Sequence, residues 1–310
     1  MAERHLVILN PAAGAGAAGA RSGEIARLLT AHGLRHELVL TERPLHAAEI
    51  AERAAGQGWD AVVAAGGDGT GNEVLNGLLA AADRGVKIPA LGLLSVGRGN
   101  DFAYGAGVPA GLEEGCAALA GGGRRLMDVG RVSGPQLPAA RYFGNGIGIG
   151  FDTIVGLEAA KMKWVHGFLG YVLGALKTMF LYYRAPRVAL SWAGTAREQK
   201  SIQISAMNGR RMGGAFFMTP EARNDDGQLD LCIAGEPRRL AMLGLILRYM
   251  KGTQAASRHI TMCRTPVFEV RALEGRLVAH ADGELLGTSL SELRMECLAA
   301  RVQVVTPVPA

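Results

Sequence analysis

The sequence predicts an α/β protein with two domains: an N-terminal doubly wound, mostly parallel α/β domain and a C-terminal antiparallel β-sandwich-like domain. Before residue 130, short apolar runs alternate with helical patterns, which is typical of a parallel sheet with helices on both faces. After it, short runs with a period of two follow one another between turns, as in antiparallel sheets. We therefore expect domains at 1–130 and 131–310, and leave open whether the last strands return to the first domain.

The first domain is expected to contain strands at 5–9, 37–40, 61–65 and 89–95, with helices at 22–32, 45–55 and after the third strand. The carboxyl ends of parallel strands meet at one edge of a sheet, where α/β proteins bind ligands. These ends lie at Asn10, Thr41, Gly66 and Gly97, and all four carry small or polar residues suited to one nucleotide.

In the second half, a glycine-dense segment at 141–152 precedes helical sequence at 153–184. Strand patterns follow at 188–192, 201–207, 267–271 and 293–297. The chain has no internal repeat and no long linker.

The composition is that of an alanine- and glycine-rich α/β protein, with 49% hydrophobic residues, 5% aromatics and 44 glycines. A net charge of +5 suits nucleotides and acidic lipids, but no basic stripe with interleaved aromatics predicts a nucleic-acid partner. The four cysteines have no paired spacing, and the first residues form no long apolar segment. We therefore expect a cytoplasmic protein with reduced thiols.

Around Gly66-Gly67-Asp68-Gly69-Thr70, a buried strand, a glycine turn and a helix start follow one another and predict a phosphate cradle. Asp68 fits beside phosphates if a divalent cation bridges the two. The alternative is a tight turn, with Thr70 and Glu73 forming a capping box. We expect this box to form. We nevertheless assign a function to the glycines and Asp68, because a plain turn needs only one glycine.

This turn, with the following Asn72-Glu73, resembles the nucleotide-binding signature of the diacylglycerol kinase-like lipid kinases. NAD kinases share its first five residues. They lack the loop that the segment 97–103 resembles, which in the lipid kinases reads Gly-Thr-Gly-Asn-Asp-Phe-Ala. Further matches at Asn10-Pro11 with Gly14, at Thr41, at 220–230 and at 281–284 extend the resemblance over nearly the whole chain.

The resemblance implies that ATP binds in the first domain. The implied contacts are Asn10, Pro11, Ala12, Ala13, Gly14, Thr41, Gly66, Gly67, Asp68, Gly69, Thr70, Asn72, Gly97, Arg98, Gly99, Asn100 and Asp101. Arg98 departs from the family, which has a threonine there. Its guanidinium can replace the lost hydroxyl as a donor to phosphate, or it can fill space that the nucleotide needs.

Two further segments acquire a function through the resemblance. Taken alone, Asp225-Asp226-Gly227 suits a tight turn between strands. The family adds a structural Mg²⁺ site, with Asp226 and the carbonyls of Arg223 and Gln228 as ligands, remote from the transferred phosphate.

Asp282-Gly283 suits a hairpin turn, in which Glu284 taken alone is a solvated charge. In the family this turn reaches the nucleotide cleft, and its glutamate is the base that deprotonates the acceptor hydroxyl. Asp68 and Asp282 would help to place metal or hydroxyl, and either of them is open as the base instead. His280 is expected to be a neighbour of the site.

The resemblance implies an ATP- and Mg²⁺-dependent lipid kinase of phospholipid metabolism, acting peripherally at a membrane surface. Diacylglycerol, a sphingoid base and phosphatidylglycerol are all open as acceptors, and a homodimer is left open. A kinase of a soluble acceptor and a non-catalytic nucleotide- or lipid-binding protein are the alternatives. A helical apolar stripe with basic flanks would suit anionic lipid, or else belong to the core. It consists of Trp164, Phe168, Leu169, Tyr171, Val172, Leu176, Met179 and Phe180, with Lys161, Lys163, Lys177 and Arg184.

Overall fold

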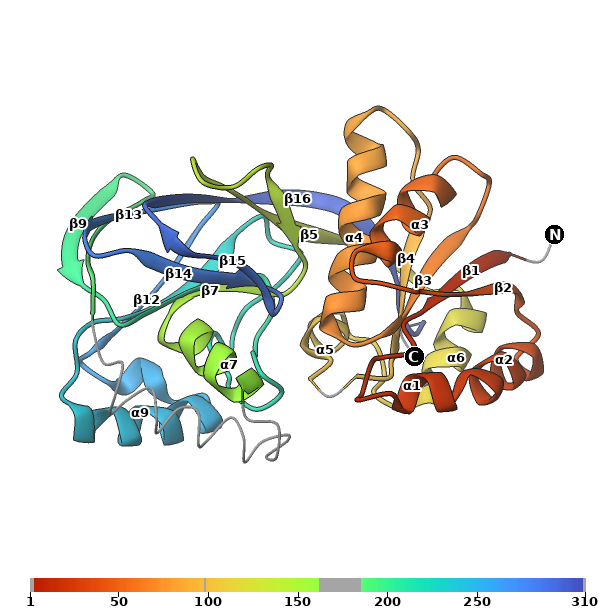
Figure 1. Cartoon of the computed structure of the whole chain (residues 1–310), viewed down its shortest axis with the longest axis horizontal. Coiled ribbons are helices and arrows are strands. Elements are labelled where there is room, and N and C mark those ends of the chain that lie inside the picture. Colours follow the sequence, from red (N-terminus) through yellow and green to blue (C-terminus); the bar gives the residue numbers. More distant parts are fainter. Residues whose placement is uncertain (1–2, 98, 162–184, 309–310) are drawn as a thin grey trace. The chain divides into compact units, whose positions relative to one another are not determined.

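The computed structural model describes residues 3–97, 99–161 and 185–308 (Figure 1). The chain forms two compact units, unit 1 with Met1–Val129 and Ala299–Ala310, and unit 2 with Gly130–Leu298. Unit 1 contains a parallel sheet and unit 2 antiparallel sheets, so the predicted fold class is confirmed. Among the described helices, none is long and apolar enough to cross a membrane.

The sheet of unit 1 is built from the strands that the sequence predicts. They are β1 (Arg4–Leu9), β2 (Arg35–Leu40), β3 (Ala61–Gly66) and β4 (Ala90–Ser95), in the order β2-β1-β3-β4 and all parallel. The end of β16 (Glu292–Val305) adds a further parallel strand, in which Val304 pairs with Leu91 of β4. Every residue of β3 is buried, as its apolar run predicts.

Helices cover both faces of this sheet (Figure 1). They are α1 (Ala17–Ala20), α2 (Ser22–Ala31), α3 (His46–Ala54), α4 (Asp68–Asp83), α5 (Asp101–Ala106) and α6 (Leu112–Gly121). On one face, Ile25 of α2 and Cys116 of α6 share an apolar cluster with Val7 and Leu94 of the sheet. On the other face, α3 packs against α4. α1 and α5 have 4 and 6 residues, too few for a periodic pattern to reveal them.

Unit 2 contains two antiparallel sheets. One has the order β12-β11-β10-β7-β14-β15, and the other contains β13, β8, β9 and the first part of β16, with β5 and β6 at its side. The bounds are β5 (Arg124–Ser133), β6 (Arg141–Phe143), β7 (Gly146–Gly150), β8 (Arg187–Trp192), β9 (Thr195–Lys200), β10 (Gln203–Met207), β11 (Leu229–Ala234), β12 (Ile260–Thr265), β13 (Val267–Glu274), β14 (Leu277–Ala281) and β15 (Glu284–Leu290).

The core of unit 2 joins the facing sides of these sheets. Ile204 and Leu231 of one sheet share an apolar cluster with Val188, Phe268 and Leu293 of the other. The described helices of the unit are α7 (Phe151–Lys161), α9 (Arg239–Lys251) and a 3₁₀ helix (Gln254–Ala256). The apolar stripe predicted between 161 and 184 depends on side chains that lie outside the described residues.

Candidate functional site

The predicted nucleotide-side loops of unit 1 start at the same edge of its sheet. Leu9, the last residue of β1, is aligned with Leu40, the last residue of β2, and with Ala65, one residue before the end of β3. Gly66 of β3 is aligned with Ser95 of β4. The loops that follow these strands therefore lie side by side, as the carboxyl ends of parallel strands must.

Glycine is required where two of these loops meet. A Cβ atom on Gly97 would lie less than 3.0 Å from the Cα atom of Gly67, and one on Gly66 would collide with the side chain of Thr70. The Gly66 carbonyl accepts hydrogen bonds from the N–H groups of Val96 (2.9 Å) and Gly97 (3.1 Å). The two loops thus approach each other through bare backbone, which leaves main-chain groups close to any ligand at this edge.

The predicted capping box of Thr70 and Glu73 is wrong. α4 begins at Asp68 with an extended Gly67 as its N-cap, so Thr70 already lies inside the first turn. Its Oγ1 accepts a hydrogen bond from Nδ2 of Asn10 (3.1 Å), which links the first loop to the glycine turn. The Glu73 carboxylate instead accepts the N–H groups of Leu45 (3.0 Å) and Ala47 (3.1 Å), at the start of α3.

Asp68 ties the glycine turn to the loop after β4. Its Oδ1 accepts the N–H of Phe102 (2.8 Å), in the first turn of α5. In the same loop Asn100 has a φ of +52°, and its amide forms two hydrogen bonds to the main chain of Gly97 (3.1 and 3.0 Å). The carboxylate of Asp68 therefore has a structural contact that does not depend on a ligand.

The other predicted contacts of unit 1 lie on or beside these loops. Asn10 Oδ1 accepts the N–H of Ala12 (3.0 Å), and Gly14 has a φ of +63°. Thr41 is buried, and its N–H donates to Leu9 (2.9 Å). Asn72 is fully buried inside α4. Arg98 lies outside the described residues. Of the remaining predicted contacts, Pro11, Ala13 and Gly99 lie in the loops, and Gly69 and Asp101 lie in the first turns of α4 and α5.

The start of α4 is suited to an anion. The N-cap residue is Gly67, which has no side chain that could cap the helix. The first N–H groups of a helix have no acceptor within the helix and are suited to donate to a ligand. A helix of 16 residues also places a partial positive charge at its N-terminus. Together with the close backbone approach of Gly67 and Gly97, this arrangement can bind phosphate oxygens.

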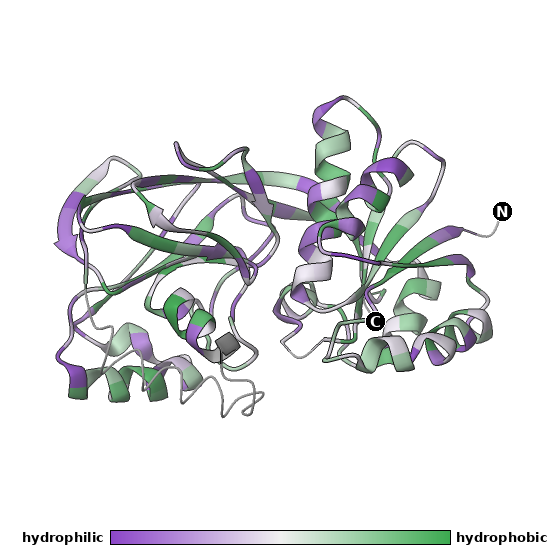
Figure 2. Ribbon diagram, viewed as in Figure 1, coloured by the Kyte–Doolittle hydropathy of each residue, from purple (hydrophilic) through white to green (hydrophobic). Residues whose placement is uncertain are grey.

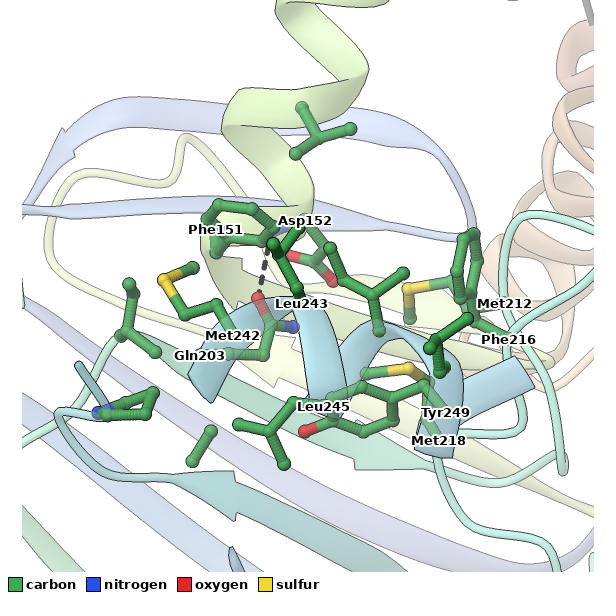
Figure 3. Close-up of a pocket in the computed structure, with 16 residues that line it drawn as sticks. Phe151, Asp152, Gln203, Met212, Phe216, Met218, Met242, Leu243, Leu245 and Tyr249 are labelled. Carbon is green, nitrogen blue, oxygen red and sulfur yellow. Dashed lines mark hydrogen bonds between the residues drawn. The ribbon is translucent and has the colours of Figure 1, made fainter. Parts of the chain in front are cut away.

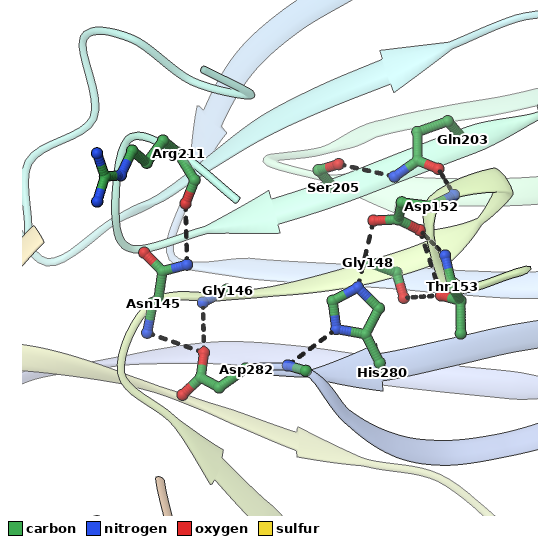
Figure 4. Close-up of polar contacts among 11 residues, drawn as sticks. Asn145, Gly146, Gly148, Asp152, Thr153, Gln203, Ser205, Arg211, His280 and Asp282 are labelled. Atoms are coloured by element: carbon green, nitrogen blue, oxygen red, sulfur yellow. Dashed lines mark hydrogen bonds and ion pairs between the residues drawn. The ribbon is translucent and has the colours of Figure 1, made fainter. Parts of the chain in front are cut away.

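In unit 2, Asp282 and Gly283 form the two-residue turn between β14 and β15, as predicted. Both have positive φ, 45° and 87°, which a type I′ hairpin turn requires. The buried Asp282 carboxylate accepts the N–H groups of Gly144 (2.7 Å), Asn145 (3.0 Å) and Gly146 (2.8 Å), contacts that the sequence did not predict. Figure 4 shows the bonds from Asn145 and Gly146. Asp282 thus fastens the hairpin to the loop before β7.

Glu284, at the first position of β15, is exposed. Within the described part of the chain its carboxylate has no hydrogen bond or ion pair. The carboxylates of Glu284 and Asp282 therefore differ in their availability to a ligand, although one residue separates them. The glutamate carboxylate remains available to a ligand, whereas the aspartate is occupied by main-chain donors.

The buried His280 pairs with Asp152, which is only slightly exposed, beside the hairpin (Figure 4). Nδ1 of His280 accepts the N–H of Gly283 (3.2 Å), and Nε2 lies 3.4 Å from Oδ2 of Asp152. A Cβ atom on Gly148 would collide with both side chains, so a larger residue there would have to displace the pair. Burial lowers the pKa of His280, but the hydrogen bond and charge of Asp152 outweigh it and raise the pKa overall.

Asp152 also borders an apolar cavity of about 280 Å³ (Figure 3). Sequence reasoning missed this cavity, because its walls come from α7, β10, β11, α9 and the segment between β10 and β11. It is lined by Phe151, Asp152, Val155, Ile202, Gln203, Met212, Phe216, Met218, Ala234, Pro237, Met242, Leu243, Leu245, Ile246, Leu247 and Tyr249.

The few polar groups of this cavity are engaged with protein. Gln203 accepts the N–H of Asp152 (2.8 Å) through Oε1 and donates to Ser205 (3.0 Å) through Nε2. The Tyr249 hydroxyl lies 3.5 Å from Sγ of Cys232. The polar groups of Gln203 and Tyr249 are therefore already engaged with protein and place no unpaired group toward an apolar ligand.

The predicted cation turn has Asp226 half-buried, with Oδ1 accepting the N–H of Gln228 (3.1 Å). Arg223 pairs through its side chain with Asp225 (3.0 Å). Asp230 lies just beyond and is buried. Its Oδ1 accepts a hydrogen bond from Arg264 (2.9 Å), and its Oδ2 has no hydrogen-bond partner among the described residues. Burial raises the pKa of Asp230, and the nearby charge of Asp226 raises it further.

The donor groups at this turn are of the types that a hard cation prefers. An unpartnered carboxylate oxygen beside a second carboxylate and main-chain carbonyls is a suitable donor set. Asp230 was not among the residues that the sequence indicated. The described residues contain no cluster of three or more His, Cys, Asp or Glu side chains that could hold a metal ion. A site here would therefore depend on the carbonyl groups.

Two family models match consecutive parts of the chain. The diacylglycerol kinase catalytic domain matches residues 4–132, and the YegS C-terminal NAD kinase beta sandwich-like domain matches residues 145–306. The chain is 33% identical over 282 residues to a Stenotrophomonas maltophilia protein named "Probable lipid kinase YegS-like", with 89% of this chain and 88% of the relative covered. It is 29% identical over 304 residues to a diacylglycerol kinase of Mycobacterium tuberculosis, with 97% and 94% covered.

Solved structures share the fold. A diacylglycerol kinase from Bacillus anthracis has a TM-score of 0.77 at 24% identity, with 98% of this chain and 97% of that chain covered. An NAD kinase from Archaeoglobus fulgidus in complex with ATP has a TM-score of 0.52 at 14% identity, with 98% and 93% covered. At these identities the likeness concerns the fold alone.

Proposed function

The chain belongs to the diacylglycerol kinase-like family of lipid kinases, and on this premise we propose that it transfers the γ-phosphoryl group of ATP to a hydroxyl group of a lipid. We propose that the reaction depends on Mg²⁺. Phosphoryl transfer needs little covalent chemistry from a protein. It needs reactants positioned in line, phosphate charge that is neutralised, and a group that accepts the hydroxyl proton.

The apolar cavity of unit 2 is the observation that best supports a lipid as the acceptor. Its volume of about 280 Å³ exceeds the roughly 150 Å³ at which an apolar cavity already holds a benzene ring. Because its walls are apolar and their polar groups are already bonded, a hydrocarbon chain fits it and a sugar or nucleoside does not. An acceptor with an acyl or long alkyl chain is therefore favoured over a soluble one.

The nucleotide is proposed to bind at the carboxyl ends of β1 to β4. The start of α4, with a glycine as its N-cap, and the close approach of Gly67 and Gly97 support phosphate binding at this edge. Asn10 supports it indirectly, since its hydrogen bond to Thr70 links the first loop to the glycine turn. A cation near Asp68 would offset the repulsion between its carboxylate and the phosphates.

Asp226, Asp230 and the carbonyls of Arg223 and Gln228 would hold a Mg²⁺ ion in the turn before β11. When bound there, the ion stabilises the turn by neutralising two neighbouring carboxylates. The unpartnered Oδ2 of Asp230 is the observation that favours such an ion. This ion is proposed to be structural.

Glu284 is proposed as the base, because its carboxylate is exposed and unengaged among the described residues. Asp282 is proposed to be a positioning residue for Glu284. With its carboxylate on three main-chain N–H groups, it holds the hairpin that carries Glu284.

The test is transfer of labelled γ-phosphate from ATP to lipids in mixed micelles, with and without Mg²⁺, beside a reaction without lipid. Diacylglycerol, a sphingoid base and phosphatidylglycerol form the panel. A labelled lipid that requires Mg²⁺ is the expected product. If ATP is bound but no lipid is labelled, the proposal is withdrawn in favour of a soluble acceptor or of a non-catalytic binding protein.

A further inference from the structure

α9 carries a row of apolar side chains on its outer side. Leu240, Leu243, Leu247 and Met250, here called the α9 stripe, follow the spacing of one helix face. All four are exposed, Leu240 by 80% and Leu247 by 59%. In Figure 2 hydrophobic colour covers much of this helix. Large apolar side chains that are exposed in a continuous row mark an interaction surface, unlike single exposed leucines.

Basic residues flank the α9 stripe, and α9 contains no acidic residue. Arg239 lies on one side of the stripe, and Arg248 and Lys251 on the other, while Arg238 precedes the helix. The nearest preceding acidic residue, Glu236, pairs with Lys200 (3.4 Å). An apolar face with basic edges matches a surface that is anionic at its border and apolar below it.

The opposite side of α9 closes the apolar cavity. Met242 and Leu245 are buried against it, while Leu243 and Leu247 of the α9 stripe also line it. The outer stripe and the cavity are therefore continuous. Among the described residues, Leu243 and Leu247 provide an apolar link between the two.

We propose that the α9 stripe docks this protein on an anionic lipid bilayer, with the cavity opening toward the hydrocarbon region. The value of such docking for phosphoryl transfer rests on the proposed function, but the docking itself does not. A second copy of the chain is a poorer partner. In a symmetric contact both copies use the same patch, so the basic edges of two stripes would lie in one interface and repel.

The experiment is sedimentation of the full chain with vesicles of phosphatidylcholine alone or with phosphatidylglycerol added, at low and high salt. We expect binding to the anionic vesicles that weakens as salt rises. The double substitution Leu240→Glu with Leu247→Glu should weaken this binding by about tenfold or more, since it removes two apolar anchors and adds negative charge.

Leu126→Glu is the matched control, because Leu126 lies in β5 and is exposed by 52%. It should bind vesicles as the unchanged chain does, and all variants should keep the same melting temperature. Arg239→Gln with Lys251→Gln should reduce binding to anionic vesicles and leave binding to neutral ones unchanged.

The proposal fails if the chain does not bind anionic vesicles, or if the leucine variant binds them as tightly as the Leu126 variant. It also fails if the leucine variant only converts a dimer to a monomer in light scattering and leaves vesicle binding intact. None of these readouts requires ATP or turnover. A chain without lipid kinase activity that still docks through α9 would overturn the proposed function alone.

Discussion

Gly97 approaches Gly67 so closely that a Cβ atom on Gly97 would lie within 3.0 Å of the Cα atom of its partner. These glycines belong to loops after two neighbouring strands, and their contact brings main-chain groups of both loops to the edge where the nucleotide is proposed to bind. The contact makes a specific demand on residue type, because any side chain at 97 must push one loop away from the other.

Gly97→Ala should therefore weaken ATP binding and lower the free energy of unfolding by about 1–3 kcal/mol. Gly23→Ala is the matched control, because a Cβ atom there meets nothing within 4 Å. Inside α2 it should stabilise the chain by up to about 1 kcal/mol. Urea unfolding and ATP titration measure both variants, and equal effects at 97 and 23 would contradict the close approach.

Glu73→Ala should destabilise the chain by about 1 kcal/mol, because two N–H groups at the start of α3 lose their acceptor. Its ATP affinity should change little, since the carboxylate points to α3 instead of the glycine turn. Glu49→Ala removes an exposed carboxylate that pairs with Arg43 (2.7 Å), and it should have a smaller effect. A melting temperature that falls equally in both variants would argue against the cap.

Asp282 and Glu284 should give opposite phenotypes. Asp282→Asn removes the negative charge to which three N–H groups donate, so the free energy of unfolding should fall by about 2 kcal/mol. Glu284→Gln should keep the melting temperature and ATP affinity while turnover falls by about 10²-fold or more. Thermal unfolding beside single-turnover kinetics separates the two. Unchanged turnover in the Glu284 variant would remove its assignment as base.

Filling the cavity should distinguish acceptors by chain length. Ala234 is buried in β11 and lines the cavity, so Ala234→Phe would occupy space that an acyl chain needs. Turnover with a long-chain acceptor should fall about tenfold or more, whereas a short-chain analogue should be phosphorylated at the original rate. Equal losses with both acceptors would indicate general damage to unit 2 instead of a chain-binding cavity.

The buried thiols should resist alkylation at neutral pH. Burial raises the pKa of Cys116 to about 11 and that of Cys232 to about 12, so almost no thiolate is present at pH 7.5. Iodoacetamide should leave both unmodified in the folded chain and modify them in urea, as read by mass spectrometry. As pH rises toward these values, the rate of modification should rise. Rapid reaction of either thiol at pH 7.5 would contradict its burial.

The sequence by itself determined the local features. The apolar run before Gly66 predicted the fully buried strand β3, because a strand covered on both faces must be apolar throughout. Asp282-Gly283 predicted a hairpin turn, because residues with positive φ are needed there and these two tolerate it. The common edge of the nucleotide-side loops also followed from the sequence, since strands joined through helices form a parallel sheet.

Only the tertiary structure decided which partners the polar groups take. Thr70 and Glu73 have the spacing of a capping box, yet the glutamate binds Leu45, 28 residues away, because the helix starts earlier than its capping pattern suggests. The carboxylate of Asp282 binds Gly144 across 138 residues, and the cavity is assembled from five separate stretches of chain. Local pattern encodes dihedral preference and burial, but not which distant segments meet. That is decided by packing of the whole unit, where each buried polar group must find a partner and apolar surfaces must fit.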